Sequence, residues 1–423
     1  MKIERFASLI CPMFALGLWV GLNCVENTYA KVRTYENVKL TDTGLTFDEF
    51  ARTPKFATGM AFLSQDDVIL IEKNTGKIIR IQNGTKLDEP LLTVNVANVS
   101  ERGLLGIAVS KEPSRAPYVF LYYTEADATN SSKVLGNRLY RYELIENRLL
   151  NPKLLLDLPA FPGMSHNGGV LRIGPDNKTL YLVIGNVNYR QNQTYMTKAE
   201  NSKGGPVPDG RAGILRVTFD GEAVDKEGIL GIGDPLNKYF SYGIRNSFGI
   251  GFDPITGNLW DTENGNNKND EINLVRPGFN SGWPVIQGLS NQKEDFDEEE
   301  LESFDGNGVY SDPEFNWIDT VAPTSLLFFN SDKLGQEYQN DLFIGSAKNG
   351  TIFHFDLNEN RTHLALDGPL SDKVANTSQE LDDVTFAKGI GLVTDVQVGP
   401  DGYLYVLTSI KHDAVLFKIV PRL

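Results

Sequence analysis

The sequence predicts an all-β protein, a six-bladed β-propeller of four-stranded antiparallel blades, preceded by a signal peptide. Three observations predict this fold. A strand–turn–strand phrase recurs along the chain, the 423 residues include 40 Gly and 20 Pro, and no stretch keeps the 3.6-residue apolar period of a helix. We assign residues 1–30 to the signal peptide, 31–49 to an N-terminal extension and 50–423 to the propeller.

The repeated phrase is an apolar strand, a turn rich in Pro, Asp or Gly, a second apolar strand and a polar loop. Gly and Asn tolerate the positive φ of such tight turns. Small antiparallel sheets in series bury both faces when they pack radially, which is the arrangement of a propeller. The clear copies are 171–184, 250–260 and 396–406, and the weaker ones are 59–72, 105–124 and 325–346.

The N-terminus has the features of a secretion signal. Lys2 and Arg5 precede an apolar run over 9–22, and a small-residue cleavage site ends at Ala30. The run is about 14 residues long, short of the ~20 that cross a bilayer as a helix. We therefore expect an exported protein, extracellular, periplasmic or on the cell surface, with no membrane span in the mature chain. An uncleaved anchor and a lipid anchor on Cys24 are the alternatives.

Eight N-x-S/T sequons suit a glycoprotein with an exposed extracytoplasmic surface. They begin at Asn83, Asn98, Asn130, Asn177, Asn192, Asn349, Asn360 and Asn376.

Composition excludes several classes of function. The net charge of −15 argues against nucleic acids and anionic membrane surfaces as partners, and is compatible with neutral small molecules or divalent cations. Cys11 and Cys24 both lie in the leader, so the mature chain has no thiol for catalysis, iron–sulfur clusters or Cys-based zinc sites. The acidic run over 293–305 is interpreted as a solvated loop, with a cation site as the alternative.

Three segments could carry chemistry. His166 lies in a Gly-rich loop directly before a strong inner strand, where a propeller opens onto its channel, and a near-neutral pKa suits a general base. Arg245 also precedes an inner strand, and its planar cation could support an oxyanion or carbonyl oxygen, or could instead tie loops together. The segment 262–273 is dense in carboxylate, amide and backbone oxygens, the ligands of Ca²⁺.

These segments resemble the glucose/sorbosone dehydrogenase family, the soluble sugar dehydrogenases that depend on pyrroloquinoline quinone (PQQ). The resemblance covers about residues 50–420 and rests on several phrases in the right order. They are 101–108, His166-Asn167-Gly168-Gly169, 174–176, 242–246, 270–273, 282–284, 322–324 and 398–402.

The resemblance implies a six-bladed propeller that oxidises a small-molecule sugar and passes electrons to an external acceptor. It makes His166 the base that removes the anomeric hydroxyl proton, while hydride passes to a carbonyl carbon of PQQ. Further roles follow at matching positions. Arg245 would support the quinone oxygen, and Asn246 and Lys348 would contact the cofactor. Trp317 would line the pocket. Gly265 and Asn266 would offer backbone carbonyls to Ca²⁺, with Asp270 beside them.

The sequence departs from the family pattern at three places. Asn186 stands where the family usually has an aspartate that orients the histidine. Leu392 and Thr394 replace two arginines that pair with PQQ carboxylates, although Thr394 stays in the predicted cofactor-binding set. Asn266 replaces a common proline. An amide hydrogen-bonds an imidazole without stabilising imidazolium, and lost cations should weaken the binding of a tricarboxylate.

Three functions remain open from the sequence. The first is a PQQ- and Ca²⁺-dependent dehydrogenase of aldoses or related alcohols. The second is a non-catalytic binding propeller that has lost PQQ, and the third is a Ca²⁺-dependent hydrolase or lactonase. The dehydrogenase requires His166 and Arg245 at one mouth of the channel, with Gly265 and Lys348 around the same cavity.

Overall fold

The computed structural model describes residues 38–111, 116–188 and 192–422. They belong to one compact unit, Asn37–Leu423. The predicted signal peptide, including Cys24 and the cleavage site at Ala30, lies outside the described residues. Within the described part of the chain, no helix is long and apolar enough to cross a membrane.

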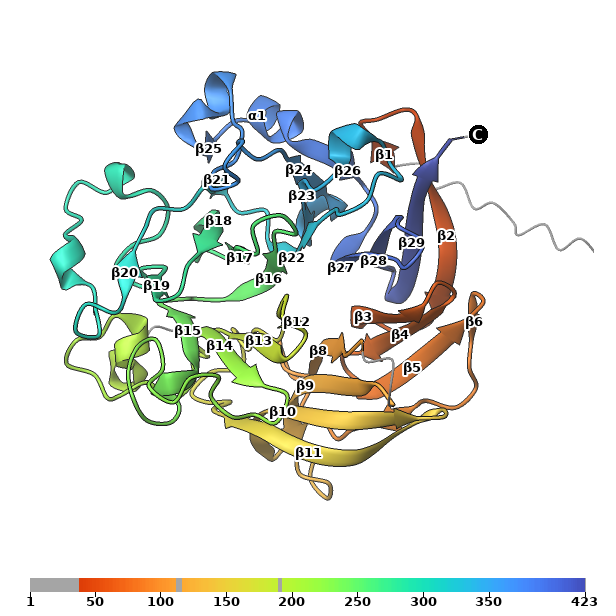
Figure 1. The fold of residues 1–423 in the computed structure, drawn as a ribbon, viewed down its shortest axis with the longest axis horizontal. Helices are drawn as coiled ribbons and strands as arrows, with labels where there is room; N and C mark the ends of the chain where they lie inside the picture. Colours follow the sequence, from red (N-terminus) through yellow and green to blue (C-terminus); the bar gives the residue numbers. More distant parts are fainter. Residues whose placement is uncertain (1–37, 112–115, 189–191, 423) are drawn as a thin grey trace, which may run out of the picture. The chain divides into compact units, whose positions relative to one another are not determined.

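The described strands form six sheets (Figure 1). The first contains β3 (Ala57–Ser64), β4 (Asp67–Glu72), β5 (Lys77–Gln82), β6 (Thr85–Lys86) and β7 (Leu92–Thr93). The second contains β8 (Leu104–Val109), β9 (Tyr118–Ala126), β10 (Val134–Ile145) and β11 (Arg148–Leu158). The third contains β12 (Leu171–Ile173), β13 (Thr179–Ile184), β14 (Gly213–Thr218), β15 (Tyr239–Tyr242), β19 (Phe279–Asn280) and β20 (Val309–Tyr310).

The remaining three sheets follow the same plan. The fourth contains β16 (Ser247–Phe252), β17 (Leu259–Glu263), β18 (Lys268–Val275), β21 (Phe315–Asp319) and β25 (Val374–Ala375). The fifth contains β22 (Pro323–Phe328), β23 (Leu342–Ser346), β24 (Ile352–Phe355), β26 (Thr385–Lys388) and β1 (Lys39–Leu40). The sixth contains β27 (Leu392–Val398), β28 (Leu404–Ile410), β29 (Asp413–Pro421) and β2 (Leu45–Thr53).

Helices are few and short in the described residues. The single α-helix there is α1 (Ser378–Asp383), and the other helical turns are 3-10 segments. They span Gln193–Tyr195, Lys198–Glu200, Leu236–Lys238, Ser290–Gln292, Glu298–Glu300, Gln336–Tyr338, Lys348–Gly350 and Gly368–Asp372.

The first strand of each sheet lies in an inner ring. Strand β3 contacts β8, followed around the ring by β12, β16, β22 and β27, which returns to β3. The sheets extend outward from this ring, as Figure 1 shows. The prediction of an all-β propeller is therefore confirmed.

The predicted uniform four-stranded antiparallel blades are wrong for several sheets. Only the second and sixth of the described sheets have four strands. Insertions between repeats add short edge strands to the others, and the pairs β15–β19, β19–β20 and β21–β25 are parallel. Such edge pairing satisfies backbone groups of the long inserted loops.

The ring is closed by strands from both ends of the described chain. Strand β2 pairs antiparallel with β29, from Leu45 opposite Pro421 to Thr53 opposite Ala414. Strand β1 adds to the edge of the fifth sheet through β26. Part of the segment that we assigned to an N-terminal extension thus belongs to the sheets.

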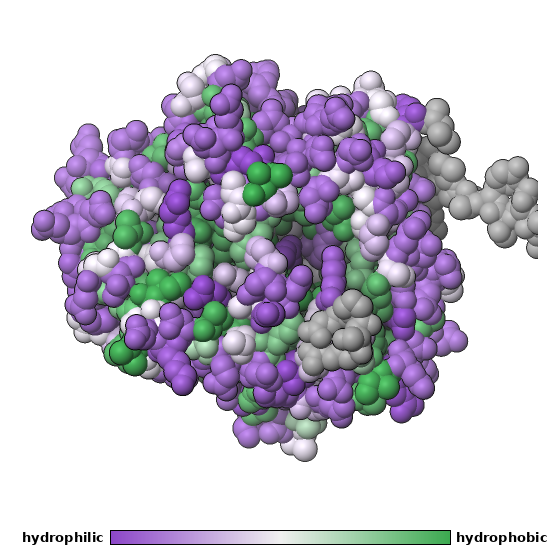
Figure 2. Space-filling model, in the orientation of Figure 1, coloured by the Kyte–Doolittle hydropathy of each residue, from purple (hydrophilic) through white to green (hydrophobic). Residues whose placement is uncertain are grey.

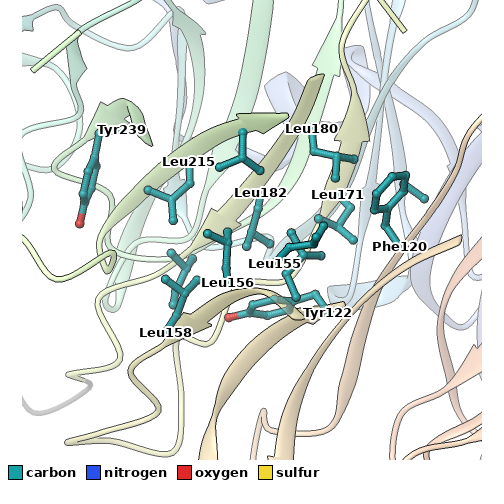
Figure 3. Packing of buried hydrophobic residues seen from close by; sticks show 14 of the residues in the cluster. Phe120, Tyr122, Leu155, Leu156, Leu158, Leu171, Leu180, Leu182, Leu215 and Tyr239 are labelled. Carbon is teal, nitrogen blue, oxygen red and sulfur yellow. The ribbon is translucent and has the colours of Figure 1, made fainter. Parts of the chain in front are cut away.

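Apolar side chains fill the space between neighbouring sheets. Figure 3 shows one such cluster, in which Tyr122 of β9 and Leu156 of β11 meet Leu182 of β13 and Leu215 of β14. Burying each leucine stabilises the fold by roughly 1.5–3 kcal/mol. Hydrophilic residues dominate the face drawn in Figure 2, with hydrophobic ones scattered among them.

All six inner strands run in the same direction along the channel, so their first residues lie at the same end of it. We call this end the front mouth. Its cavity has a volume of about 300 Å³ and is lined by Thr58, Leu105, Leu171, Thr324 and Leu392, among others. A second cavity, of about 980 Å³, lies at the opposite end and is lined by residues such as Ser64, Val109 and Val398.

Candidate active site

His166 is held in the loop that precedes β12, at the front-mouth end of the third sheet. Its backbone is left-handed, with φ at 62°, and the residue is 4% exposed. The backbone N–H donates to Oε2 of Glu101 at 2.6 Å, and Nδ1 lies 2.7 Å from Oδ1 of Asn186. The loop and the residues after β13 together fix the position of the imidazole.

The amide of Asn186 determines the tautomer of His166. The backbone N–H of Asn188 donates to the same Oδ1 atom at 3.2 Å, which identifies that atom as the acceptor oxygen. Nδ1 of His166 must then donate its hydrogen, and Nε2 is the basic nitrogen. The departure from aspartate at this position therefore preserves the tautomer that a base needs.

Arg245 lies directly before β16, also at the front-mouth end of its sheet. Its backbone N–H donates to Oε1 of Glu263 at 2.6 Å, and its Nη1 donates to the carbonyl of Asn264 at 2.8 Å. Its guanidinium carbon lies 5.2 Å from the centre of the Trp283 ring, a cation–π contact. No role was predicted for Trp283, because this contact joins two separate loops.

The structure brings His166 and Arg245 together. The backbone N–H of Asn186 donates to the carbonyl of Arg245 at 2.9 Å. Gly185 lies between the two segments, where a Cβ atom would approach the carbonyl oxygens of His166 and Arg245 to 2.6 and 2.7 Å. Burial and the positive charge of Arg245 lower the pKa of His166 to about 4, so its imidazole is neutral at pH 7.

Glu101 is a site residue for which no role was predicted, although it opens the phrase 101–108. It lines the front cavity, and its Oε2 also accepts from Nδ2 of Asn246 at 3.3 Å. Burial raises the pKa of Glu101. The hydrogen bond from His166 and the charge of Arg245 act in the opposite direction but do not cancel this effect. A signal was present, because Glu101 precedes an inner strand just as His166 and Arg245 do.

The predicted calcium segment is ordered around Asp270. Oδ1 of Asp270 accepts from the backbone N–H of Gly265 at 2.8 Å, and Oδ2 accepts from Val321 and Ala322 at 2.7 Å each. Asp270 therefore clamps two loops through backbone N–H groups. Asn266, at the tip, accepts from Nη2 of Arg245 at 3.4 Å, which links this segment to the site.

Lys348 lies beside the same pair of loops. Its ammonium donates to the carbonyl of Thr320 at 2.7 Å and also contacts the Thr320 hydroxyl. The side chain is exposed, and its charge contributes to holding down the pKa of Asp270, which burial raises. Lys348 is thus at the rim, next to the segment that Asp270 clamps, and is not among the described residues lining the front cavity.

The expectation that Trp317 walls the pocket is wrong. Trp317 is 1% exposed and packs in the core against Phe315, Phe353 and Phe355. It lies on β21, the fourth strand of its sheet counted from the channel, too far out to face it. Thr394 does line the front cavity, as does Leu392.

Three buried carboxyl groups lie behind Arg245, on one face of β17 and β18. Glu263 pairs across the strands with Glu271, and Asp261 is two residues away on β17. Burial raises the pKa of all three groups, that of Glu263 to about 7. These carboxyls converge inside a sheet.

Of the described residues that line the front cavity, only Glu101 and Asp395 are acidic, and Asp395 lies 3.8 Å from Arg172.

The fold and site define a β-propeller that carries a neutral histidine and an arginine at one mouth of its channel. The family model described as Glucose / Sorbosone dehydrogenase matches residues 54–418, and the chain belongs to this family.

Two relatives match this chain over most of their own length. Aldose sugar dehydrogenase YliI of Escherichia coli K12 is 28% identical over 368 residues, covering 86% of this chain and 89% of that protein. Quinoprotein glucose dehydrogenase B of Acinetobacter calcoaceticus is 28% identical over 411 residues, covering 81% of each.

Solved structures share the fold. A putative oxidoreductase (glucose dehydrogenase) of Thermus thermophilus superposes with a TM-score of 0.68 at 25% identity, covering 89% of this chain and all of that chain (100%). The PQQ-bound aldose sugar dehydrogenase of Streptomyces coelicolor gives 0.65 at 22% identity, covering 91% and 98%. At that identity the second similarity supports the fold alone.

Proposed function

We propose that this protein is an exported sugar dehydrogenase that oxidises aldoses or related alcohols by hydride transfer to PQQ, with Ca²⁺ as the second cofactor. The observation that carries the proposal is the pairing of His166 with Arg245 at the front mouth, through Asn186 and Gly185. Family membership and the names of the two relatives support the same reaction class. An external acceptor would then reoxidise the cofactor.

The polar side of the site fits PQQ. Arg245 and Lys348 supply cations at the mouth, and Oδ1 of Asn246 is buried with no hydrogen-bond partner among the described residues. Leu392 and Thr394 add no charge to the lining of the front cavity, and the charged pair beside them there is Arg172 with Asp395. Arg245, Asn246 and Lys348 would hold PQQ, with Thr394 against it, and fewer cations than the family pattern implies would meet its carboxylates. Bound PQQ supplies the hydride acceptor.

The calcium site is proposed in a modified form. The backbone carbonyls of Gly265 and Asn266 would hold Ca²⁺, since oxygen ligands of this kind suit a hard cation. Asp270 already accepts three backbone N–H groups, so its role would be to fix this loop.

The residues of this chain would handle the substrate proton. His166 is neutral at pH 7 and has its basic Nε2 defined by Asn186, so it can accept the proton of a sugar hydroxyl. Arg245 is fixed by Asn264 and Trp283, and its charge would stabilise negative charge on a neighbouring oxygen during the reaction.

Reconstitution tests this function. The mature chain is incubated with Ca²⁺ and PQQ, and dye reduction is followed with a panel of aldoses. We expect turnover in the wild type and its loss in His166→Ala, while Glu89→Gln, an exposed change on a loop away from the lining residues, keeps the wild-type rate. Absence of turnover with every aldose, although PQQ binds, would overturn the dehydrogenase.

A binding propeller without PQQ is the second candidate, because Leu392 and Thr394 line the cavity in place of arginines. If the protein has this second function, adding PQQ at micromolar concentration should leave the PQQ spectrum unchanged, and no turnover should be seen.

We also propose that the exported chain is N-glycosylated. All eight sequon asparagines are exposed, as glycan addition requires. Expression in a secreting eukaryotic cell should give a mass that falls on treatment with an N-glycosidase. An unchanged mass would argue against it.

A further inference from the structure

A histidine and two aspartates converge in the fifth sheet, at the end opposite the front mouth. Asp341 lies directly before β23, while His354 lies on β24 and Asp356 directly follows that strand. Since β23 runs antiparallel to the inner strand β22, its first residues lie away from the front mouth. Each of the three side chains offers a ligand atom within 4.8 Å of the other two, and no other group of this kind occurs in the residues that the structure describes.

The Nε2 atom of His354 faces both carboxylates. It lies 3.0 Å from Oδ2 of Asp341 and 3.4 Å from Oδ1 of Asp356. Nε2 carries at most one hydrogen, and only the contact with Asp341 has the geometry of a hydrogen bond. Zinc binds nitrogen and oxygen ligands at about 2.0–2.2 Å, so two ligand atoms on one ion lie roughly 3 Å apart. The spacing of Nε2 from the two oxygens therefore matches a shared metal ion.

Aromatic side chains hold the imidazole of His354 in this orientation. The centre of its ring lies 5.2 Å from that of Tyr338, 4.9 Å from that of Phe343 and 6.5 Å from that of Phe386. The hydroxyl of Tyr338 donates to Oδ2 of Asp42 at 3.2 Å, which fixes Tyr338 in turn. A nitrogen ligand that is already oriented loses little conformational freedom when an ion binds.

The two carboxylates lack a basic partner other than His354. In the described part of the chain, no lysine or arginine forms an ion pair with Asp341 or Asp356. Arg361 reaches the backbone carbonyl just before Asp341, but its guanidinium pairs with Asp253 at 2.9 Å. Burial and the neighbouring Asp341 raise the pKa of Asp356, and His354 acts in the opposite direction. A divalent cation would relieve the repulsion between the two carboxylates.

We propose that Asp341, His354 and Asp356 bind one divalent transition-metal ion, with zinc as the best match. One imidazole nitrogen with two carboxylate oxygens suits zinc, whereas calcium prefers a larger set of oxygen ligands. Three protein ligands leave a fourth position for water, and the side chain of Asp356 is 62% exposed, so an ion can enter from solvent. The bound ion would join the start of β23 to the end of β24 and stabilise the fifth sheet. This site does not depend on the proposed dehydrogenase function.

Titration calorimetry on the mature chain, without a histidine tag and after treatment with a chelator, tests this site. Zn²⁺ is added with Ca²⁺ in excess, so that sites built from oxygen ligands are already filled. We expect one Zn²⁺ to bind per chain and the unfolding temperature to rise with Zn²⁺ concentration, because the ion binds the folded chain. Absence of saturable Zn²⁺ binding under these conditions would overturn the proposal.

Variants locate the bound ion. Losing an outer partner of a metal ligand already costs about 10- to 100-fold in affinity, so His354→Asn and Asp356→Asn should each raise the Kd for Zn²⁺ by about 10-fold or more. Asp356 is exposed, so its variant gives a result even if His354→Asn folds poorly. His412→Asn is the control, since His412 is exposed and its φ of 78° suits asparagine. Wild-type affinity in both site variants would place the ion elsewhere and refute the site.

Discussion

Nδ1 of His166 lies 2.7 Å from Oδ1 of Asn186, so a neutral amide orients the imidazole. This hydrogen bond favours the charged ring only weakly, and burial and Arg245 outweigh it. His166 is therefore neutral over most of the pH range. The amide of Asn186 orients the imidazole without adding a charge beside it.

Replacing Asn186 by Asp should place a negative charge against Nδ1. We expect the pKa of His166 to rise from about 4 by on the order of 1 to 3 pH units, measured by NMR titration of the imidazole. Asn186→Ala is the control, because it removes the hydrogen bond without adding charge and should not raise the pKa. An unchanged pKa in Asn186→Asp would show that the side chain at 186 does not face the ring in solution.

Acid should destabilise the protein through His166. Its pKa falls from 6.5 in the unfolded chain to about 4 in the folded state, so the unfolded chain binds more protons between these values. Stability from this residue is therefore complete above pH 6.5 and declines as pH falls towards 4, by on the order of 3 kcal/mol in total.

Urea unfolding checks this at several pH values. His166→Gln should lose stability less steeply than the wild type between pH 6.5 and 4. Parallel curves for the two proteins would mean that other groups cause the acid sensitivity.

A methyl group at Gly185 should disturb both halves of the site at once. In Gly185→Ala the Cβ atom would lie 2.6 to 2.9 Å from the His166 carbonyl, the Arg245 carbonyl and Oδ1 of Asn246. We expect a loss of about 1–3 kcal/mol in the free energy of unfolding and a fall in kcat. Gly204→Ala is a matched control, since a Cβ there meets nothing within 4 Å. Equal stabilities of the two variants would contradict the packing described here.

Asp270→Asn should release the loops at Gly265 and at Val321–Ala322. An amide cannot accept from all three N–H donors, so at least one loses its acceptor, at a cost of about 1–3 kcal/mol. Thermal unfolding should show this loss with Ca²⁺ and equally in a chelator, whereas Asp88→Asn, at an exposed position, should show none. A loss seen only with Ca²⁺ would make Asp270 a metal ligand instead.

Leu392→Arg should tighten PQQ binding. A charge-assisted contact is worth roughly 1.5–3 kcal/mol, so Kd should fall about 10-fold or more, as measured by titration calorimetry. Leu392→Gln adds length and polarity without charge and should change Kd little. No gain in Leu392→Arg would show that the cofactor carboxylates do not face this wall.

Local patterns predicted the inner hairpins well. The predicted phrases 171–184, 250–260 and 396–406 became β12–β13, β16–β17 and β27–β28, because alternation and turn residues act over a few positions. The same reasoning placed His166 and Arg245 at strand starts, and a propeller brings strand starts together.

Contacts between distant segments could not be predicted in this way. Trp317 was placed at the pocket by the family resemblance, but its distance from the channel depends on the order of the strands within its sheet. The contact between Glu101 and His166 spans 65 residues of sequence, and the parallel edge strands β19, β20 and β25 pair across inserted loops. Tertiary packing determines the position of Trp317, the contact between Glu101 and His166, and the pairing of the edge strands.

The pairing of β2 with β29 has a consequence for synthesis of the protein. Since β2 comes before the inner strands of all six sheets and β29 comes after them, the sixth sheet cannot be complete until β29 has been synthesised. Until then β2 has no partner strand, and chaperones or aggregation would act on its unpaired edges. The front mouth takes its shape only when this last strand docks.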